Sequence, residues 1–304
     1  MAISRAQLVK ELEPGLNALF GLEYKRYENQ HAEIYNIESS DRAFEEEVML
    51  SGFANAEVKA EGSGVSFDEA QETYTARYTH DTIALAFAIT EEAIEDNLYD
   101  RLASRYTKAL ARSMSNAKQV KAAAPLNNGL SSIATFKAGD TVSLFSTNHT
   151  TVSGTAVKNT LTTQADLNET SLEQGLIDIA GMTDERGLRV AARGMKMIVP
   201  SANQFAAERL LKSQGRTGTA DNDINAVVSM GMIPQGYRVN NFLTDTDSWY
   251  IVTDVPNGMK MFQRAALKTA MEGDFDTGNV RYKARERYSF GVSDYRGIFG
   301  VEGA

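Results

Sequence analysis

The stretch NVRYKARERYSFGVSDYRGIFG, residues 279–300, carries the pattern that decides the fold. Cations occupy every second position of its first half, at Arg281, Lys283, Arg285 and Arg287. The residues between them are apolar apart from Glu286, namely Val280, Tyr282, Ala284 and Tyr288. Because successive side chains of a β-strand point to opposite faces, this spacing predicts a strand with one basic face and one buried face.

The chain as a whole is acidic, which makes a basic strand at its end unexpected. Its 304 residues carry a formal net charge of −9, and 42% of them are hydrophobic, as in an ordinary globular protein. A negatively charged surface repels phosphate, so nucleic-acid binding by the protein surface at large is disfavoured. The absence of cysteine excludes disulfides, thiolate nucleophiles and cysteine-ligated zinc.

The N-terminal residues predict neither a secretion signal nor a membrane-spanning segment. They lack an apolar core of about 7 to 15 residues followed by a cleavage site, and no window approaches ~18 consecutive apolar residues. We therefore expect a soluble protein that is not secreted and has no membrane partner.

Residues 41–80 predict a long two-stranded ribbon. Two extended arms meet at the glycine-rich EGSG of residues 61–64, a plausible hairpin tip. In the second arm, Tyr74, Ala76, Tyr78 and His80 fall on one face with a period of two. An isolated two-stranded ribbon is marginally stable in water, so this one is expected to lie against another surface.

The ribbon and the basic strand have complementary charges. Residues 41–73 contain nine acidic and two basic residues, a net of −7, whereas residues 279–296 contain five basic and two acidic residues, a net of +3. One interpretation is a solvated edge strand, whose cations discourage unwanted pairing. The other is that the acidic ribbon of one subunit lies over the basic strand of its neighbour. The second predicts the following inter-subunit residues: Glu45, Glu46, Glu47, Glu57, Glu61, Asp68, Glu69, Glu72, Arg281, Lys283, Arg285 and Arg287.

Two helical patterns flank the ribbon. Residues 3–21 predict a short amphipathic helix interrupted by Pro14. Residues 90–124 predict a long helix that starts at Thr90 and ends before Pro125. Its apolar stripe is expected at Ile94, Leu98, Leu102, Tyr106, Leu110, Ala117 and Val120.

The remaining chain predicts a mixed subdomain. Residues 126–169 are rich in Ser, Thr, Asn and Gly and are expected to form irregular surface structure with one short strand. Capping-box patterns at Thr170 and Ser201 predict two helices, while GMKMIVP and two runs around residues 245–247 predict strands. The fold class is therefore α+β.

No motif supports a catalytic, cofactor or metal site. The histidines are His31, His80 and His149, too few for a His-based site unless the fold gathers them; His149 is expected in a solvated loop. The EGSG segment lacks a phosphate-loop pattern, and DNDIN, residues 221–225, lacks the glycine and glutamate of a calcium loop.

The order of these parts resembles the Hong Kong 97-type major capsid proteins of tailed bacteriophages. The segments LFSTNHTTVSG (144–154), MTDERGLRVAARGMKMIVPSANQFAAERLLKS (182–213) and FDTGNVRYKARERYSFGVSDYRGIFG (275–300) are similar to phage major head subunits, including relatives of the Mu-type head protein. The resemblance implies an N-terminal arm (1–40), an extended loop (41–82), a peripheral domain with a spine helix (83–129), an axial domain (130–264) and return strands to the peripheral domain (265–304).

The resemblance also implies a function. Such a protein assembles into the hexamers and pentamers of an icosahedral head that encloses double-stranded DNA without sequence-specific binding. Expected partners are other copies of the chain, a separate scaffolding protein and a portal, and the expected location is the virion, assembled in the host bacterial cytoplasm. Two alternatives stay open: an encapsulin-type nanocompartment shell, which shares the fold, and an acidic α+β enzyme with a cleft that gathers His149 and carboxylates.

Overall fold

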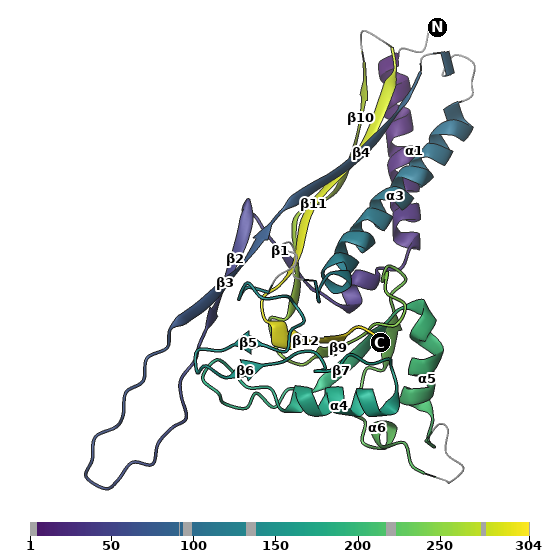
Figure 1. The fold of residues 1–304 in the computed structure, drawn as a ribbon. Coiled ribbons are helices and arrows are strands. Elements are labelled where there is room, and N and C mark those ends of the chain that lie inside the picture. The colour runs from purple at the N-terminus through teal and green to yellow at the C-terminus, as the bar shows by residue number, and fades with distance from the viewer. Residues whose placement is uncertain are drawn as a thin grey trace.

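The computed structural model describes residues 5–90, 92–93, 99–131, 138–216, 223–274 and 278–303. It contains an elongated blade, a second unit at the base of the blade, and a loop that projects away from both (Figure 1). The blade consists of one four-stranded sheet and two long helices, and the second unit has a sheet and core of its own.

The sheet of the blade has the order β1–β10–β11–β4. β10 (Met259–Gly273) and β11 (Val280–Val292) are antiparallel, β4 (Asp81–Ile89) is antiparallel to β11, and β1 (Asn36–Ser39) is parallel to β10. The predicted basic strand is β11, and its alternation is confirmed. It lies between two other strands, so its interpretation as a solvated edge is wrong.

Helices α1 (Arg5–Arg26) and α3 (Tyr99–Asn127) lie side by side on one face of this sheet (Figure 1). Leu16 and Phe20 of α1 meet Leu110 and Met114 of α3 over the buried ring of Tyr282 on β11. α1 continues through Pro14 and is longer than predicted. With 29 residues, α3 spans about 44 Å at a rise of 1.5 Å per residue.

Two predictions about α3 are wrong. The helix continues through Pro125 to Asn127, because Leu126 is buried and its carbonyl accepts a hydrogen bond from the Tyr250 hydroxyl at 3.2 Å. Of the expected apolar stripe, Leu110 is buried, but Tyr106 is 47% exposed and Val120 50% exposed. The buried stripe instead includes small and polar residues, which the apolar periodicity could not reveal: Ala103, Thr107, Leu110, Ala111, Met114, Ser115, Lys118, Gln119 and Ala122. Ile94, Leu98 and the side chain of Leu102 lie outside the described part of the chain.

The predicted ribbon is paired only at its base. β2 (Phe44–Leu50) and β3 (Glu72–Thr79) form an antiparallel pair, and residues 51–71 extend beyond it without strand structure to a turn at residues 61–62. The alternation is confirmed, since Ala76, Tyr78 and His80 are buried. We call residues 51–71 the projecting loop; Figure 1 shows it extending away from the blade.

The second unit has a sheet of order β12–β9–β7–β8. Its strands are β7 (Gly194–Val199), β8 (Tyr237–Val239), β9 (Trp249–Thr253) and β12 (Ile298–Val301). The three predicted strands are therefore confirmed. Because β12 pairs with β9, the final strand of the segment 265–304 lies in this sheet, whereas β10 and β11 lie in the blade.

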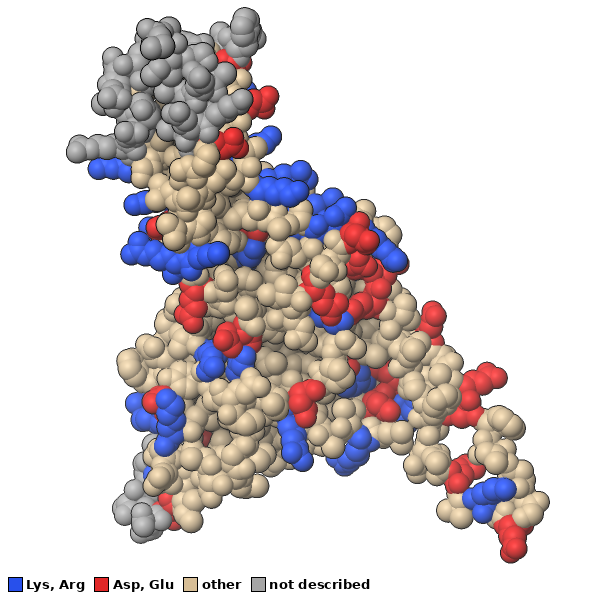
Figure 2. Space-filling view, turned by 180° about the vertical axis from the view of Figure 1, so that it is seen from behind, with Lys and Arg blue, Asp and Glu red and all other residues tan. Residues whose placement is uncertain are grey.

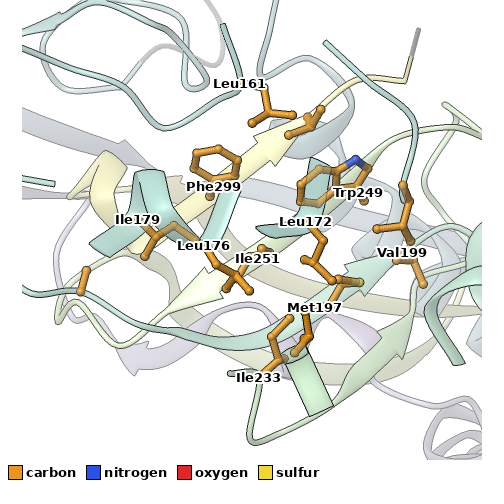
Figure 3. Close-up of a cluster of buried hydrophobic side chains, with 14 of the residues drawn as sticks. Leu161, Leu172, Leu176, Ile179, Met197, Val199, Ile233, Trp249, Ile251 and Phe299 are labelled. Carbon is orange, nitrogen blue, oxygen red and sulfur yellow. The ribbon is translucent and has the colours of Figure 1, made fainter. Parts of the chain in front are cut away.

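The core of the second unit forms where helix α4 (Glu169–Ala180) packs on this sheet. Leu172 and Leu176 of α4 meet Trp249, Ile251 and Phe299 (Figure 3). The helix begins two residues earlier than predicted, because Asn168, not Thr170, is the N-cap and forms the capping box with Ser171. Further elements of this unit are η3 (Ser201–Asn203), α5 (Gln204–Lys212), α6 (Ala226–Ser229) and η4 (Tyr295–Gly297), while η1 (Gln30–Glu33) lies against α3. Ser201 thus opens a 3-10 turn, and α5 follows it.

Residues 138–169 are not the surface segment that their composition predicted. They form two short strands, β5 (His149–Thr150) and β6 (Ala156–Val157), and insert Leu144, Phe145 and Leu161 into the cores. Polar residues of this segment are also buried, and they form hydrogen bonds inside the protein. The side-chain nitrogen of Asn159, itself fully buried, donates to the carbonyls of Leu144, Tyr295 and Ile298.

Candidate inter-subunit surface

The basic face of β11 is the side of the blade sheet opposite the helices. Arg281, Lys283 and Arg285 are exposed there, and Arg287 is half-buried. The facing residues of β4 are small, because Arg281 pairs with Ala88, Lys283 with Ala86 and Arg285 with Ala84. The cations therefore project above their small neighbours, and a hollow of about 430 Å³ beside them is lined in part by Ala86 and Ala270.

Glu286 breaks the alternation of charge because it faces the helices. It is fully buried, and its Oε2 lies 2.5 Å from Nζ of Lys118 on α3. The hydroxyl of Tyr24 on α1 donates to the other carboxylate oxygen at 3.3 Å. Lys118 also lies over the rings of Tyr24 and Tyr288. This paired carboxylate connects both helices to the strand.

The four predicted cations differ in their partners. Arg281 forms an ion pair with Asp274 across the end of the hairpin. In the described part of the chain, Lys283 and Arg285 have no ion-pair partner, so their charges face solvent. Arg287 points toward the base of the ribbon, where its charge helps to lower the pKa of His80. Lys283 and Arg285 are therefore the cations most available to another molecule.

Four of the predicted acidic residues are bound within their own subunit. Glu47 pairs with Lys260 and accepts a hydrogen bond from Ser293, and Glu45 accepts one from Ser40 at 2.7 Å. Glu46 lies 3.7 Å from Arg77, and Asp68 lies 2.6 Å from Arg186. The amide of Ala54, and then Arg186, lower the pKa of Asp68.

The other four acidic residues fit the inter-subunit prediction better. Glu57, Glu61, Glu69 and Glu72 are all exposed along the projecting loop or at its base. Within the residues that the structure describes, none of these four carboxylates contacts a cation. Figure 2 shows acidic side chains along the projecting loop and Lys and Arg side chains gathered across the blade.

The base of the ribbon is fixed to the blade by a buried polar cluster that the sequence did not predict. The ring of His80 lies between two hydroxyls, with Nε2 2.9 Å from Ser40 Oγ and Nδ1 3.0 Å from Ser289 Oγ. Burial, followed by Arg287, lowers the pKa of His80, and Glu45 opposes the effect. The Tyr78 ring lies directly on Gly291, where an added Cβ would be 2.6 Å from the ring. These contacts at the base therefore fix the direction in which the ribbon leaves the blade.

The projecting loop also exposes apolar side chains, which an analysis of charge alone did not single out. Val58 is 99% exposed and Phe67 97% exposed, and Phe53 and Val65 are largely exposed as well. Full burial of one such side chain contributes about 1.5 to 3 kcal/mol. Several exposed apolar residues on one segment mark an interaction surface.

The three histidines, which a His-based site would need together, lie among different partners. The described residues contain no group of three His, Asp or Glu residues that could hold a metal ion. His149 is fully buried, not solvated as predicted: Nδ1 lies 2.6 Å from Asp140, Nε2 lies 3.1 Å from Asn159, and the ring stacks on Tyr295. Residues 221–222 of DNDIN lie outside the described ranges.

Among the described helices, none combines the length and the apolar character that crossing a membrane requires.

The comparisons with known proteins agree with this architecture. A family model described as phage capsid protein matches residues 73–301. No curated protein matches the chain.

Solved structures of capsids and related particles share the fold at low sequence identity. A chain of the procapsid of bacteriophage JBD30 is 13% identical with a TM-score of 0.55, and the match covers 99% of this chain and 77% of that one. The capsid of Myoviridae phage XM1 is 12% identical with a TM-score of 0.54, covering 89% of each chain. A virus-like particle from Pyrococcus furiosus is 10% identical with a TM-score of 0.52, covering 94% of this chain and 98% of that one.

The family match covers most of the chain, and the structures confirm the α+β fold that the resemblance implied. The chain belongs to the phage capsid protein family and has the Hong Kong 97-type capsid fold.

Proposed function

We propose that copies of this structural capsid protein assemble into hexamers and pentamers, which close an icosahedral head around double-stranded DNA. The observation that carries the proposal is the projecting loop. Residues 53–72 are exposed along their whole length, yet they include apolar side chains and unpaired carboxylates. A segment of this kind needs a second surface, and the same chain supplies one.

That surface is the basic face of β11 on a neighbouring subunit. Its cation Lys283 lines a hollow and Arg285 lies next to it on the same face of the strand, and the loop and its base carry four carboxylates that are unpaired in the described chain. Exposed ion pairs contribute about 0 to 1 kcal/mol each, so they determine register and choice of partner. Burial of Phe67 and Val58 supplies more of the affinity.

The other assignments follow from this proposal. The blade with α1 and α3 is the peripheral domain, the second unit is the axial domain, and the ribbon with its loop is the extended loop. The protein is located in the virion after assembly in the host cytoplasm, with a separate scaffolding protein and a portal as partners. A subunit charge of −9 disfavours tight electrostatic binding of the enclosed DNA by the subunit surface as a whole.

Charge reversal followed by rescue tests the proposal. Lys283→Glu with Arg285→Glu is expected to abolish closed particles in electron microscopy after size-exclusion chromatography. Glu57→Lys, Glu61→Lys and Glu69→Lys on the loop should restore them in part. Lys25→Glu, at an exposed position of α1, is the control and should leave assembly intact. Normal assembly of the strand variant contradicts the proposal.

The contents of the particles distinguish a head from a nanocompartment. Nuclease-protected double-stranded DNA supports a phage head, whereas enclosed protein without DNA supports a cargo shell.

A further inference from the structure

Helix α3 is a second concentration of positive charge, and the sequence analysis did not single it out. The chain contains 40 acidic residues, yet residues 101–127 contain none. The same segment contains six cations, Arg101, Arg105, Lys108, Arg112, Lys118 and Lys121.

The cations of α3 divide into two groups. Lys118 is buried against Glu286, and Lys121 lies 2.5 Å from Asp81 at the start of β4. Arg105, Lys108 and Arg112 are exposed, and they form no ion pair or hydrogen bond with any described residue. The side chain of Arg101 lies outside the described part. The first group stabilises the blade, while the second has no partner among the residues of the blade that the structure describes.

The spacing of the exposed group costs stability in the isolated subunit. Residues three and four apart lie next to each other on a helix, so Lys108 is adjacent to both Arg105 and Arg112. Like charges at this spacing destabilise a helix by about 0.2 to 0.5 kcal/mol per pair. The charges of these three cations, which no described residue neutralises, therefore do not stabilise the helix, which indicates a role in contact with another molecule.

The position of these cations favours a partner other than the projecting loop. α3 covers one face of the blade sheet, and Lys283 and Arg285 stand on the opposite face. Each subunit has one projecting loop, which the proposed function places on the β11 face. In the shell of the proposed function, the helical face of the blade is not covered by a projecting loop, so it is left for another partner.

We propose that the exposed side of α3 faces the inside of the shell, where Arg105, Lys108 and Arg112 contact the phosphates of the enclosed DNA. This proposal rests on the proposed function. Double-stranded DNA carries one charge per about 1.7 Å, and the three cations extend over about 10 Å of helix, so several phosphates lie within their reach. These contacts are electrostatic and do not depend on the base sequence of the DNA.

The acidic character of the rest of the subunit is consistent with contacts of this kind. Three phosphate contacts give a salt dependence with a slope of about −2.7 in log affinity against log salt for each subunit. Such contacts are weak at physiological salt and allow the DNA to slide. The arrangement orders the outermost layer of DNA and does not prevent its release.

Photo-crosslinking in purified DNA-filled heads tests the proposal. Benzoylphenylalanine is placed at Ala109, an exposed position beside the three cations, and in a separate chain at Phe205, which is 68% exposed on α5. The probe at Ala109 is expected to crosslink to the packaged DNA. The triple variant Arg105→Gln, Lys108→Gln, Arg112→Gln should lower that yield at least threefold. The matched triple variant Arg189→Gln, Arg193→Gln, Arg209→Gln removes three other exposed cations and should not change it.

Each outcome decides the proposal. DNA-filled heads whose probe at Ala109 crosslinks only to protein show that α3 binds an acidic protein, which overturns the proposal. An unchanged yield in the α3 triple variant overturns it as well. If that variant does not assemble, the crosslinks in heads with native cations decide alone. A failure of the unmodified chain to form particles refutes the proposed function instead, so the two failures are distinguishable.

Discussion

The buried ion pair between Lys118 and Glu286 gives a prediction whose size follows from the structure. Replacing Glu286 with leucine leaves the ammonium of Lys118, whose side chain is 10% exposed, without its counter-charge beneath α3. Removing one partner of a buried pair typically costs 3 to 5 kcal/mol, so we expect a loss of about 4 kcal/mol. That is a large part of the roughly 5 to 15 kcal/mol that stabilises a protein domain.

The double variant Lys118→Met, Glu286→Leu shows whether the instability comes from the unpaired buried charge of Lys118 or from the loss of the ion pair itself. It removes both charges and keeps similar volumes, and such replacements are often neutral or stabilising. We expect its unfolding free energy to lie within about 1 kcal/mol of the unmodified chain. Tyr24 loses its hydrogen-bond acceptor in both variants, so this loss does not contribute to the difference in stability between them.

Urea unfolding of unassembled subunits, followed by circular dichroism at a concentration below that of assembly, measures both variants. The control is Glu208→Gln, which removes the exposed pair with Lys212 and should change stability by less than about 0.5 kcal/mol. A cost below 1 kcal/mol for Glu286→Leu, or a double variant as unstable as the single one, would refute the reasoning.

Three further predictions concern pH, the base of the ribbon and the loop. Burial, and then Lys118, lower the pKa of His31 from 6.5 to about 4, so the folded state favours the neutral ring. The contribution of His31 to the unfolding free energy is complete above pH 6.5 and falls by about 3 kcal/mol toward pH 4. His31→Gln should remove this pH dependence from urea-unfolding curves. Gly291→Ala forces a methyl group against the Tyr78 ring and should cost about 1 to 3 kcal/mol in the same assay, with Gly273→Ala, where space is open, as the control. Phe67→Ser should leave the unfolding free energy of the subunit within about 0.5 kcal/mol and raise the protein concentration needed for particle formation, as measured by light scattering; equal assembly would show that the ring is not buried between subunits.

The sequence predicted the features of the fold that depend on local periodicity. The alternation in β11 identified both its faces, and the single exception, Glu286, proved to be a buried carboxylate. The alternation in β3 likewise identified its inner face. Period-two patterns are reliable here because both strands have one face in contact with the protein interior.

The features that depend on tertiary contacts were not predictable. The inner face of the ribbon includes Glu45 and Glu47, because β2 pairs with β3 in a register that no local pattern specifies. The buried stripe of α3 includes Lys118 and Gln119 because partners on β11 and in the segment that follows α1 satisfy them. Net charge identified the ribbon as acidic, but only the structure separates the carboxylates bound within the subunit from those that remain available.

Crosslinking between subunits shows directly whether the projecting loop of one subunit lies on β11 of its neighbour, and the sequence has no native cysteine that could react in the background. One chain carries Glu69→Cys on the loop and another carries Lys283→Cys on β11; they are mixed before assembly and treated with a short bismaleimide. The account predicts a crosslinked dimer that contains one chain of each kind. It also predicts no such dimer when Lys25→Cys on α1 replaces the strand variant. Particles that assemble normally without the loop-to-strand dimer, with loop positions 57 and 61 also failing to crosslink, would contradict it.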